Sequence, residues 1–563
     1  MNDRSQNWPA MTLAQAHARL TAPGAPFETV PVMVRGRTTA VWKNVPATAS
    51  EAFARARTHG EREFLVYGQE RVSYDAFARA VLAVAALLVQ RGLQKGDRVA
   101  LVMRNLPEWP VVFMGALLAG AIAVPLNAWW TGTELAYAIL DSGARFVFAD
   151  AERLARLADL PPTQPIVARA ANAPAGVTVL EDVIGTPGHW ADLPEGVMPD
   201  VVLSPEDDAT IFYTSGTTGT PKGALGTHRS LTTNIFAAPF SEARNALRRG
   251  DALKPPTKQR VTLLAVPFFH VIGSLSVFLP NMVAGGKLVL MRKFEPDEAL
   301  GLIEKERVTV TGGVPAVPLA LLEQAKGRDL SSLQLITFGG APSPPSLAGR
   351  IRKNLGAMPG QGWGMTETSA TCATHSAEDY LHRPESCGPA LPVSGLKILF
   401  NGIEQPPGIA GELWAFGPNI VKGYWNRPDA TAAAFRDGWL KTGDVAMLDG
   451  EGFCTILDRG EDMLIRGGEN IYCIEVENVL IQHPAVVDAA LIGLPHSILG
   501  EVPAALVQTR LGIDVSEGEL REFAAARLAA FKVPQQLWIS QDVLPRNGGG
   551  KLVKSALRRL FGT

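Results

Sequence analysis

Residues 213–223 have the composition of a phosphate-binding loop. They combine three glycines, five threonine or serine hydroxyls and one lysine, Lys222, within eleven positions. The apolar run 209–213 at the start of this segment predicts the end of a buried strand. A glycine-rich turn after a strand lets backbone N–H groups converge on an anion, and hydroxyl and ammonium groups add to the cradle. The segment therefore predicts phosphate binding, although many Ser/Thr/Gly clusters are only flexible surface loops.

Two common phosphate motifs do not fit this segment. A Walker A loop needs a lysine directly after a glycine and a hydroxyl residue directly after the lysine, whereas Lys222 lies between Pro221 and Gly223. The dinucleotide fingerprint G-x-G-x-x-G also fails, because Gly216, Gly219 and Gly223 are three and four residues apart. The phosphate chemistry is therefore of another kind.

Two further turns supply groups that suit a nucleotide. The segment 339–342, Gly-Gly-Ala-Pro, follows the apolar run 335–338, which predicts a strand. In open α/β sheets, ligands bind at the carboxyl ends of the strands. In the glycine-rich segment 361–368, Trp363 offers a flat face to a purine and Glu367 offers a hard oxygen ligand for Mg²⁺. We therefore expect the two turns to lie beside each other.

A carboxylate and a second lysine complete the set. Asp444 ends the tight turn 438–444, where its carboxylate suits the two hydroxyls of a ribose. Lys551 ends the glycine-rich segment 545–551, from which it can reach into the site of another domain. Each residue alone has a simpler explanation, such as a core tryptophan, a turn carboxylate or a solvated surface charge. Together, in this order and spacing, these residues are too many to be explained by coincidence.

Composition and charge describe an ordinary globular protein. Of 563 residues, 47% are hydrophobic and 19% charged, and the formal net charge of −2 provides no basic surface for nucleic acid. Four cysteines lie far apart without C-x-x-C spacing, which argues against a zinc site or disulfide framework and favours a reducing, cytoplasmic location.

No segment of the sequence predicts membrane insertion. The N-terminus lacks an apolar signal core, and the most apolar run, 110–125, is shorter than the ~20 residues of a membrane span. A peripheral membrane contact and a homodimer are left open.

The order of predicted elements indicates an α/β fold. Short strands alternate with helices, which predicts βαβ units and mainly parallel sheets, and residues 396–457 change to a β-rich pattern. We expect a large N-terminal domain of α/β subdomains with a small β-rich subdomain over 1–457, a hinge at 458–462 and a small α+β lid domain over 463–563. Strands are expected at 64–67, 97–103, 121–125, 146–149, 209–213, 261–266, 287–290, 308–310 and 335–338, and residues 1–45 are expected to be an irregular lead-in with one short helix.

The motifs resemble those of the adenylate-forming superfamily of acyl-CoA synthetases, firefly luciferases and peptide-synthetase adenylation domains. The resemblance covers the chain from about residue 50 onward and favours the AMP-forming acid:CoA ligases. Such enzymes convert a carboxylic acid and ATP to an acyl-adenylate and pyrophosphate, and then transfer the acyl group to a thiol. The motifs that carry the resemblance are YTSGTTGTPKG (213–223), FFH (268–270), GGAP (339–342), GWGMTET (362–368), GWLKTGD (438–444), DRGED (458–462), RGGENIY (466–472) and PRNGGGK (545–551).

The resemblance implies ATP, Mg²⁺ and CoA as cofactors and co-substrates and gives each motif a role. Glu367 would be the Mg²⁺ ligand, and Thr366 would contact the α-phosphate. Asp444 and Arg459 would hold the ribose, and Lys551 would bridge the substrate carboxylate and the α-phosphate. The β- and γ-phosphates would be held by Thr214, Ser215, Gly216, Thr217, Thr218, Gly219 and Lys222, and the nucleotide would also contact Gly340, Ala341, Pro342, Trp363 and Gly364.

For the thiol step, the resemblance implies a rotation of the lid about Glu461. Gly467 and Gly468 would then line the pantetheine tunnel, Lys532 would contact a CoA phosphate, and His270 would gate the acyl site. The sequence departs from the family at Trp363, where tyrosine is usual, and at Cys473, where many members have proline.

The acid is less well specified. By the resemblance, small and apolar residues line its pocket, and these suit a fatty or similar hydrophobic acid. An aromatic acid of the coumarate or benzoate kind is the alternative, as is a stand-alone adenylation enzyme that loads a carrier protein. A non-catalytic nucleotide sensor is a further alternative, which the intact set of polar residues disfavours. The expected wall residues are Ile272, Ser276, Val314, Gly339, Gly362 and Gly364.

Overall fold

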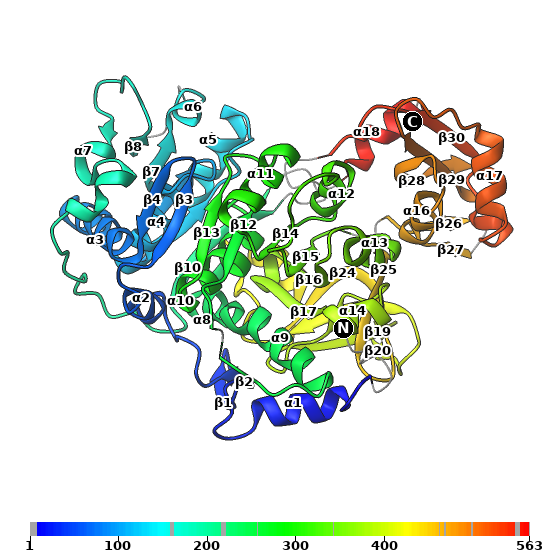
Figure 1. Cartoon of the computed structure of the whole chain (residues 1–563), viewed down its shortest axis with the longest axis horizontal. Coiled ribbons are helices and arrows are strands. Elements are labelled where there is room, and N and C mark those ends of the chain that lie inside the picture. Colours follow the sequence, from blue (N-terminus) through cyan, green and yellow to red (C-terminus); the bar gives the residue numbers. More distant parts are fainter. Residues whose placement is uncertain are drawn as a thin grey trace.

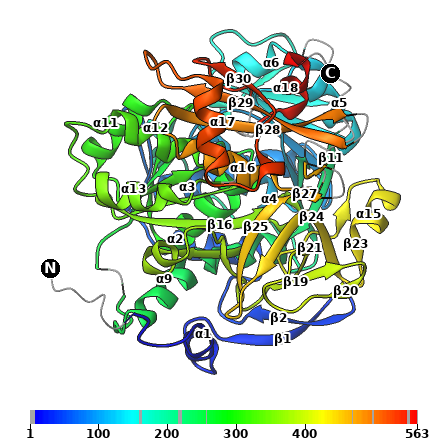
Figure 2. The ribbon, with the colours of Figure 1, turned by 90° about the vertical axis from the view of Figure 1, so that its right-hand side faces the viewer.

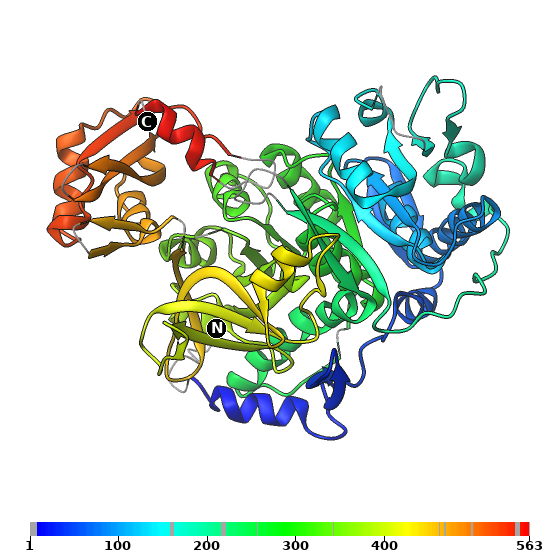
Figure 3. The same cartoon turned by 180° about the vertical axis from the view of Figure 1, so that it is seen from behind.

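The computed structural model describes residues 8–157, 163–214, 221–255, 257–341, 343–460, 462–466, 469–496, 499–546 and 552–561. Within these residues, the strands form two eight-stranded sheets, a seven-stranded sheet, a five-stranded sheet and an isolated hairpin. Figure 1 shows the five-stranded sheet and its helices, coloured orange and red, at one end of a larger body, and Figure 3 shows the same arrangement from behind. The α/β class with a β-rich layer and a small C-terminal α+β part is confirmed.

The first large sheet carries the phosphate loop. Its strand order is β22-β11-β10-β6-β5-β7-β8-β9, and β10 pairs in parallel with β6 but antiparallel with β11. Its central strands are apolar and buried on both faces, as parallel sheets require. The strands are β5 (Arg98–Val102), β6 (Ile122–Pro125), β7 (Ala144–Asp150), β8 (Gln164–Ala168), β9 (Thr178–Val179), β10 (Asp208–Thr214), β11 (Lys222–Thr227) and β22 (Gly423–Tyr424).

The second large sheet has the order β17-β16-β15-β14-β12-β13-β3-β4 and is parallel from β16 to β3. The strand expected at 308–310 begins only at Val310, because Arg307 ends the preceding helix in a left-handed conformation with φ 52°. The strands are β3 (Glu63–Tyr67), β4 (Glu70–Ser73), β12 (Val261–Leu264), β13 (Lys287–Leu290), β14 (Val310–Gly313), β15 (Leu335–Gly339), β16 (Met358–Met365) and β17 (Ala370–Ser376).

Helices alternate with the parallel strands along the chain, because a parallel pair needs a crossover connection. Short 3-10 segments are η2 (Pro187–Asp192), η3 (Asn234–Phe236) and η5 (Thr366–Thr368), and η4 (Ile272–Phe278) is a π-helix. The α-helices of the large body after the first are α2 (Ala49–Arg57), α3 (Tyr74–Gln90), α4 (Glu108–Leu118), α5 (Gly132–Ser142), α6 (Ala151–Leu154), α7 (Glu181–Ile184), α8 (His228–Thr233), α9 (Ala237–Arg248), α10 (Leu279–Ala284), α11 (Pro296–Glu306), α12 (Ala316–Gln324), α13 (Ser346–Asn354), α14 (Ala377–His382) and α15 (Pro428–Ala434).

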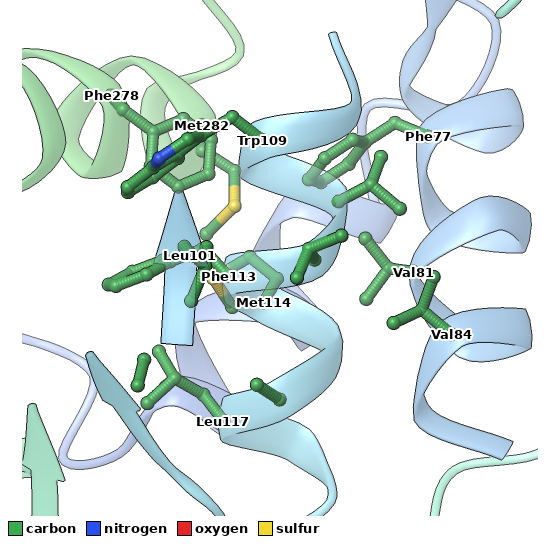
Figure 4. Close-up of a cluster of buried hydrophobic side chains, with 14 of the residues drawn as sticks. Phe77, Val81, Val84, Leu101, Trp109, Phe113, Met114, Leu117, Phe278 and Met282 are labelled. Carbon is green, nitrogen blue, oxygen red and sulfur yellow. The ribbon is translucent and has the colours of Figure 1, made fainter. Parts of the chain in front are cut away.

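Helices α3 and α4 form the centre of the largest apolar core, which also includes residues of both large sheets. Figure 4 shows the side chains of α4 between α3 and the residues of η4 and α10. Trp109 stacks on Phe113 and on Phe268, with ring centroids 5.0 and 4.8 Å away. The two helices pack closely at Gly115, where a Cβ would lie 2.8 Å from Cγ1 of Val84. This core therefore joins the two sheets into one unit. No helix in the described part of the chain is long and apolar enough to cross a membrane.

The β-rich sheet expected over 396–457 is present, and its strands pair antiparallel. Its last strand runs through Asp458 and Arg459, so these two residues of the expected hinge segment belong to the sheet. The strands are β18 (Gly388–Pro389), β19 (Gly395–Phe400), β20 (Ile403–Glu404), β21 (Gly411–Phe416), β23 (Phe435–Arg436), β24 (Trp439–Leu448) and β25 (Phe453–Arg459).

The N-terminal lead-in contains the expected short helix, α1 (Leu13–Thr21), and also a hairpin that the sequence reasoning missed. Strands β1 (Thr29–Val34) and β2 (Arg37–Trp42) pair antiparallel across a turn in which Arg35 and Gly36 both have positive φ. Figure 2 shows this blue hairpin below the yellow strands of the β-rich sheet. The lead-in is therefore a regular structure that packs on the large body.

The C-terminal segment has its own apolar core beneath its five-stranded sheet. The order is β27-β26-β29-β28, with β30 paired in parallel to β29. The elements are β26 (Leu464–Arg466), β27 (Glu469–Ile471), α16 (Cys473–Ile481), β28 (Val486–His496), β29 (Gly500–Thr509), α17 (Glu517–Ala525), η6 (Ala530–Lys532), β30 (Gln536–Ser540) and α18 (Lys554–Leu560).

A buried carboxylate lies where the β-rich sheet meets the C-terminal segment. The side chain of Asp458 accepts hydrogen bonds from the backbone N–H groups of Arg459 (2.8 Å) and Cys473 (2.5 Å). Burial raises the pKa of Asp458 from 3.8 to about 7, against the opposing attraction of Lys554. Folding therefore favours the protonated carboxyl of Asp458.

We expect this group to make the folded state less stable as pH rises from about 4 to 7. In that interval the folded protein binds more protons at Asp458 than the unfolded chain, so the free energy of unfolding falls by up to about 1.4 kcal/mol per pH unit. Asp458→Asn should remove this contribution. Denaturant unfolding of both proteins between pH 4 and 8 measures it, and parallel pH profiles for wild type and variant would contradict it.

Candidate active site

The ends of the phosphate loop are held by a pair of antiparallel strands. Thr214 and Lys222 are direct register partners of β10 and β11, and the Oγ1 of Thr214 donates to the carbonyl of Lys222 (3.4 Å). The loop thus joins two strands and not a strand and a helix. The expected phosphate ligands Ser215, Gly216, Thr217, Thr218 and Gly219 lie outside the described residues.

Helix α5 contacts both ends of this loop. The hydroxyl of Tyr213 donates to Oδ2 of Asp141 (2.8 Å), and the hydroxyl of Tyr137 donates to the carbonyl of Pro221 (3.3 Å). Arg427 donates to Oδ1 of Asp141 (2.6 Å) and to the hydroxyl of Tyr137 (3.1 Å). These interactions connect the two flanks of the loop to one helix and to one arginine.

Lys222 and Glu367 meet at Tyr424. The ammonium of Lys222 lies 5.5 Å from the centroid of the Tyr424 ring, and the Tyr424 hydroxyl donates to Oε1 of Glu367 (2.8 Å). Burial, with a further contribution from Glu367, raises the pKa of the Tyr424 hydroxyl, which therefore stays a hydrogen-bond donor. Sequence reasoning named Lys222 and Glu367 but missed Tyr424, whose partners are set by the pairing of β22 with β11.

The buried carboxylate of Glu367 is suited to one metal contact. The described residues contain no group of three or more His, Cys, Asp or Glu side chains that could hold a metal ion. Mg²⁺ is commonly held by one or two carboxylates together with substrate phosphates and water. Glu367, in η5 beside the strands β10 and β11, fits that kind of site. Thr366, half-buried at the start of η5, lies next to it in the chain.

A second cluster forms where β16 meets the β-rich sheet. The indole N–H of Trp363 donates to Oδ2 of Asp444 (2.8 Å), and Nε of Arg459 lies 3.0 Å from Oδ1 of the same carboxylate. Trp363 is only 8% exposed and Asp444 only 4%. Hydrogen bonds to a charged group contribute about 1.5–3 kcal/mol each, so this pairing fixes the orientation of the indole. The cluster brings together the residues expected at adenine and ribose.

The glycine segments lie side by side, as expected. Gly339 pairs in register with Gly362, and a Cβ on Gly339 would lie 2.5 Å from the Gly362 carbonyl oxygen. A Cβ on Gly364 would lie 1.6 Å from the carbonyl oxygen of Ala370, so this position requires glycine. The half-buried Gly340 and Ala341 follow β15, and Pro342 lies outside the described residues.

The expected acyl pocket adjoins these glycines. A Cβ on Gly340 would lie 3.2 Å from Cδ1 of Ile272, which comes two residues after the expected gate, His270. The half-buried hydroxyls of Ser276 on η4 and Thr371 on β17 are 3.1 Å apart and form a polar pair. Ile272, one of the expected wall residues, thus lies beside Gly340, one of the expected nucleotide residues.

The lid residues are only partly described. Lys532 donates to both carboxylate oxygens of Glu475, at 2.8 and 2.7 Å, so its charge is paired in this arrangement. Glu461, Gly467, Gly468 and Lys551 lie outside the described residues.

Protein-family models match most of this chain. Residues 52–425 match the family model described as AMP-binding enzyme, and residues 475–551 match the AMP-binding enzyme C-terminal domain. The chain is 36% identical to a feruloyl-CoA synthase from an Amycolatopsis species, over 90% of this chain and 98% of the relative. It is also 36% identical to the 2-succinylbenzoate–CoA ligase of Geobacillus kaustophilus, over 89% and 95% of the two chains.

A solved structure shows the same fold. It is the o-succinylbenzoate CoA synthetase of Bacillus subtilis with its acyl-adenylate intermediate, which is 31% identical, with a TM-score of 0.76 over 92% of this chain and 98% of that chain. The same enzyme with ATP and magnesium ion gives 32% identity and a TM-score of 0.75 over 90% and 98% of the two chains. The chain uses ATP, Mg²⁺ and CoA, and it belongs to the AMP-binding enzyme family as an AMP-forming acid:CoA ligase of the adenylate-forming superfamily.

Proposed function

We propose that this ligase activates an aromatic carboxylic acid. The observation that carries the proposal is the hydroxyl pair of Ser276 and Thr371, which offers hydrogen bonds to a ring substituent. Ser276 lies on η4 with the expected wall residue Ile272, and Thr371 is the register partner of Gly364. A saturated fatty chain would form no hydrogen bond with these two hydroxyls. The names of the two relatives support an aromatic acid better than the fatty acid expected from the sequence.

In the proposed mechanism, one carboxylate oxygen of the acid attacks the α-phosphorus of ATP and pyrophosphate leaves. The CoA sulfur then attacks the acyl carbon, the thiol loses its proton, and AMP leaves. Mg²⁺ neutralises charge on the phosphate oxygens. Glu367 orients the nucleotide through that ion, Thr366 contacts the α-phosphate, and Lys551 bridges the carboxylate and the α-phosphate. The loop residues Thr214, Ser215, Gly216, Thr217, Thr218, Gly219 and Lys222 hold the leaving pyrophosphate.

The nucleoside and thiol sites complete the proposal. Asp444 and Arg459 hold the ribose, and the single hydrogen bond of Asp444 Oδ2 to Trp363 leaves carboxylate lone pairs for hydroxyl groups. His270 gates the acyl pocket. We assign the boundaries 1–457, 458–462 and 463–563 to the large domain, the hinge and the lid, with Glu461 as pivot. Adenine contacts are assigned to Gly340, Ala341, Pro342, Trp363 and Gly364, and CoA contacts to Gly467, Gly468 and Lys532.

An acid screen tests the substrate class. We expect hydroxycinnamic and substituted benzoic acids to give pyrophosphate release with kcat/KM at least about fivefold above saturated fatty acids, since a hydrogen bond gained in the pocket is worth about 1 kcal/mol. Ser276→Ala should lower kcat/KM for hydroxyl-bearing acids more than for unsubstituted cinnamate. Faster turnover of fatty acids than of any aromatic acid would reject the proposal.

The roles of two lysines are separable by half-reaction. Lys551→Ala should slow pyrophosphate release by about 100-fold or more, because it removes a cation from the transition state. Lys532→Ala should leave pyrophosphate release unchanged and raise KM for CoA. Pre-steady-state release of pyrophosphate without CoA, followed by thioester formation on CoA addition, measures both steps. Full-rate adenylation by Lys551→Ala would exclude the role given to that lysine.

A further inference from the structure

Tyr424 contacts two residues that come from distant parts of the chain. Its hydroxyl donates to Glu367 in η5, which follows β16, and its ring faces the ammonium of Lys222 at the start of β11. The bond to Oε1 fixes the direction of the Glu367 carboxylate, and Oε2 together with the second lone pair of Oε1 remains for a ligand. One tyrosine therefore fixes the direction of the carboxylate and borders the lysine.

The backbone of Tyr424 is fixed from two sides. Residues Ala224 and Tyr424 are register partners, so β22 extends the sheet that contains the phosphate-loop strands. The N–H of Tyr424 donates to Oγ1 of Thr431 (2.9 Å) in α15. The ring also meets Phe435 edge-on, with centroids 6.1 Å apart. The hydroxyl thus starts from a rigid position, and the bond to Glu367 costs little conformational entropy.

The same segment is tied to the flanks of the phosphate loop. The N–H of Trp425 donates to the carbonyl of Gly223 (2.7 Å), and the indole N–H of Trp425 donates to the carbonyl of Asp141 (3.1 Å). Arg427 pairs with the carboxylate of Asp141, whose side chain is only 10% exposed. A shift of Tyr424 would therefore have to break contacts with both β11 and α5.

A second attachment holds the backbone of Glu367. The N–H of Val421 donates to the carbonyl of Glu367 (2.9 Å), and Nδ2 of Asn419 donates to the carbonyl of Thr368 (3.0 Å). The segment 419–427 consequently binds Glu367 by main chain and by side chain. Val421, which binds the Glu367 backbone, and Tyr424, which binds its carboxylate, are only three residues apart, so one short segment of chain holds both parts of Glu367.

We propose that Tyr424 is a positioning residue of this ligase, which aims Glu367 at the magnesium-bound nucleotide through its hydroxyl and limits the position of Lys222 through its ring. The inference depends on the role proposed above for Glu367. Groups that hydrogen-bond a metal ligand orient it, and their loss typically lowers metal affinity 10- to 100-fold. The hydroxyl and the ring should therefore have separable effects on ATP binding.

Binding of ATP to the full-length protein by calorimetry, without acid or CoA, separates the two effects. The dissociation constant of ATP is measured in saturating Mg²⁺ and in excess EDTA. The constant in EDTA divided by the constant in Mg²⁺ reports how much the metal strengthens ATP binding. We expect Tyr424→Phe to lower this ratio by about tenfold or more through weaker binding in Mg²⁺ alone. Tyr424→Leu should in addition weaken binding in EDTA, because Lys222 loses the ring that it faces.

Tyr74→Phe is the matched control. The hydroxyl of Tyr74 shares its proton between the carbonyls of Asn281 and Gly286 within the largest apolar core, so this variant should lower the unfolding midpoint without changing the ratio. A ratio for Tyr424→Phe within twofold of wild type, or an equal change in Tyr74→Phe, would overturn the inference. Glu367→Gln separates the two levels of the argument. If it changes the ratio while Tyr424→Phe does not, only the inference on Tyr424 fails, and if it has no effect, the assignment of Glu367 fails as well.

Discussion

The close approach of β16 to its neighbours is the constraint on which the rest of the site depends. Gly339 and Gly364 lie so near to the facing carbonyl oxygens that a Cβ at either position would have to push the strands apart. Glycine at both lets β16 pair in register with β15 and pair with β17 across an irregularity between Trp363 and Gly364. That register sends Trp363 toward Asp444 and places Glu367 against Tyr424. A small change in the pleat would separate the nucleoside end of the site from the phosphate end.

Local signals in the sequence predicted most of the large body. Apolar runs bounded by glycine and proline identified the central parallel strands, and the glycine-rich turns identified Lys222, Glu367 and Asp444 as one constellation. The hairpin at the N-terminus was missed because short strands with exposed, mixed side chains lack a clear alternating pattern. The onset of β14 was misplaced because a helix cap, and not the strand residues, decides where that strand begins.

The partners of the site residues could not be predicted in the same way. Asp141 and Arg427 are 286 residues apart, and Tyr424 lies 57 residues from Glu367, so only tertiary packing brings each pair together. None of these three partners belongs to a glycine-rich motif, which was the signal that the sequence reasoning used. The acid was uncertain for a related reason, since small apolar walls accept a fatty chain and a ring alike. A hydroxyl pair formed by two separate elements is visible only in three dimensions.

The register pairing of Thr214 with Lys222 has a consequence for the exchange of loops between proteins. Two residues that face each other across an antiparallel ladder fix where the loop between them begins and ends, and loop length and turn type decide whether that register is kept. A loop of another composition that preserves the register, grafted between these two positions, would begin and end at the same points in space. The phosphate loop between Thr214 and Lys222 is thus a segment that can be exchanged while Lys222 keeps its position.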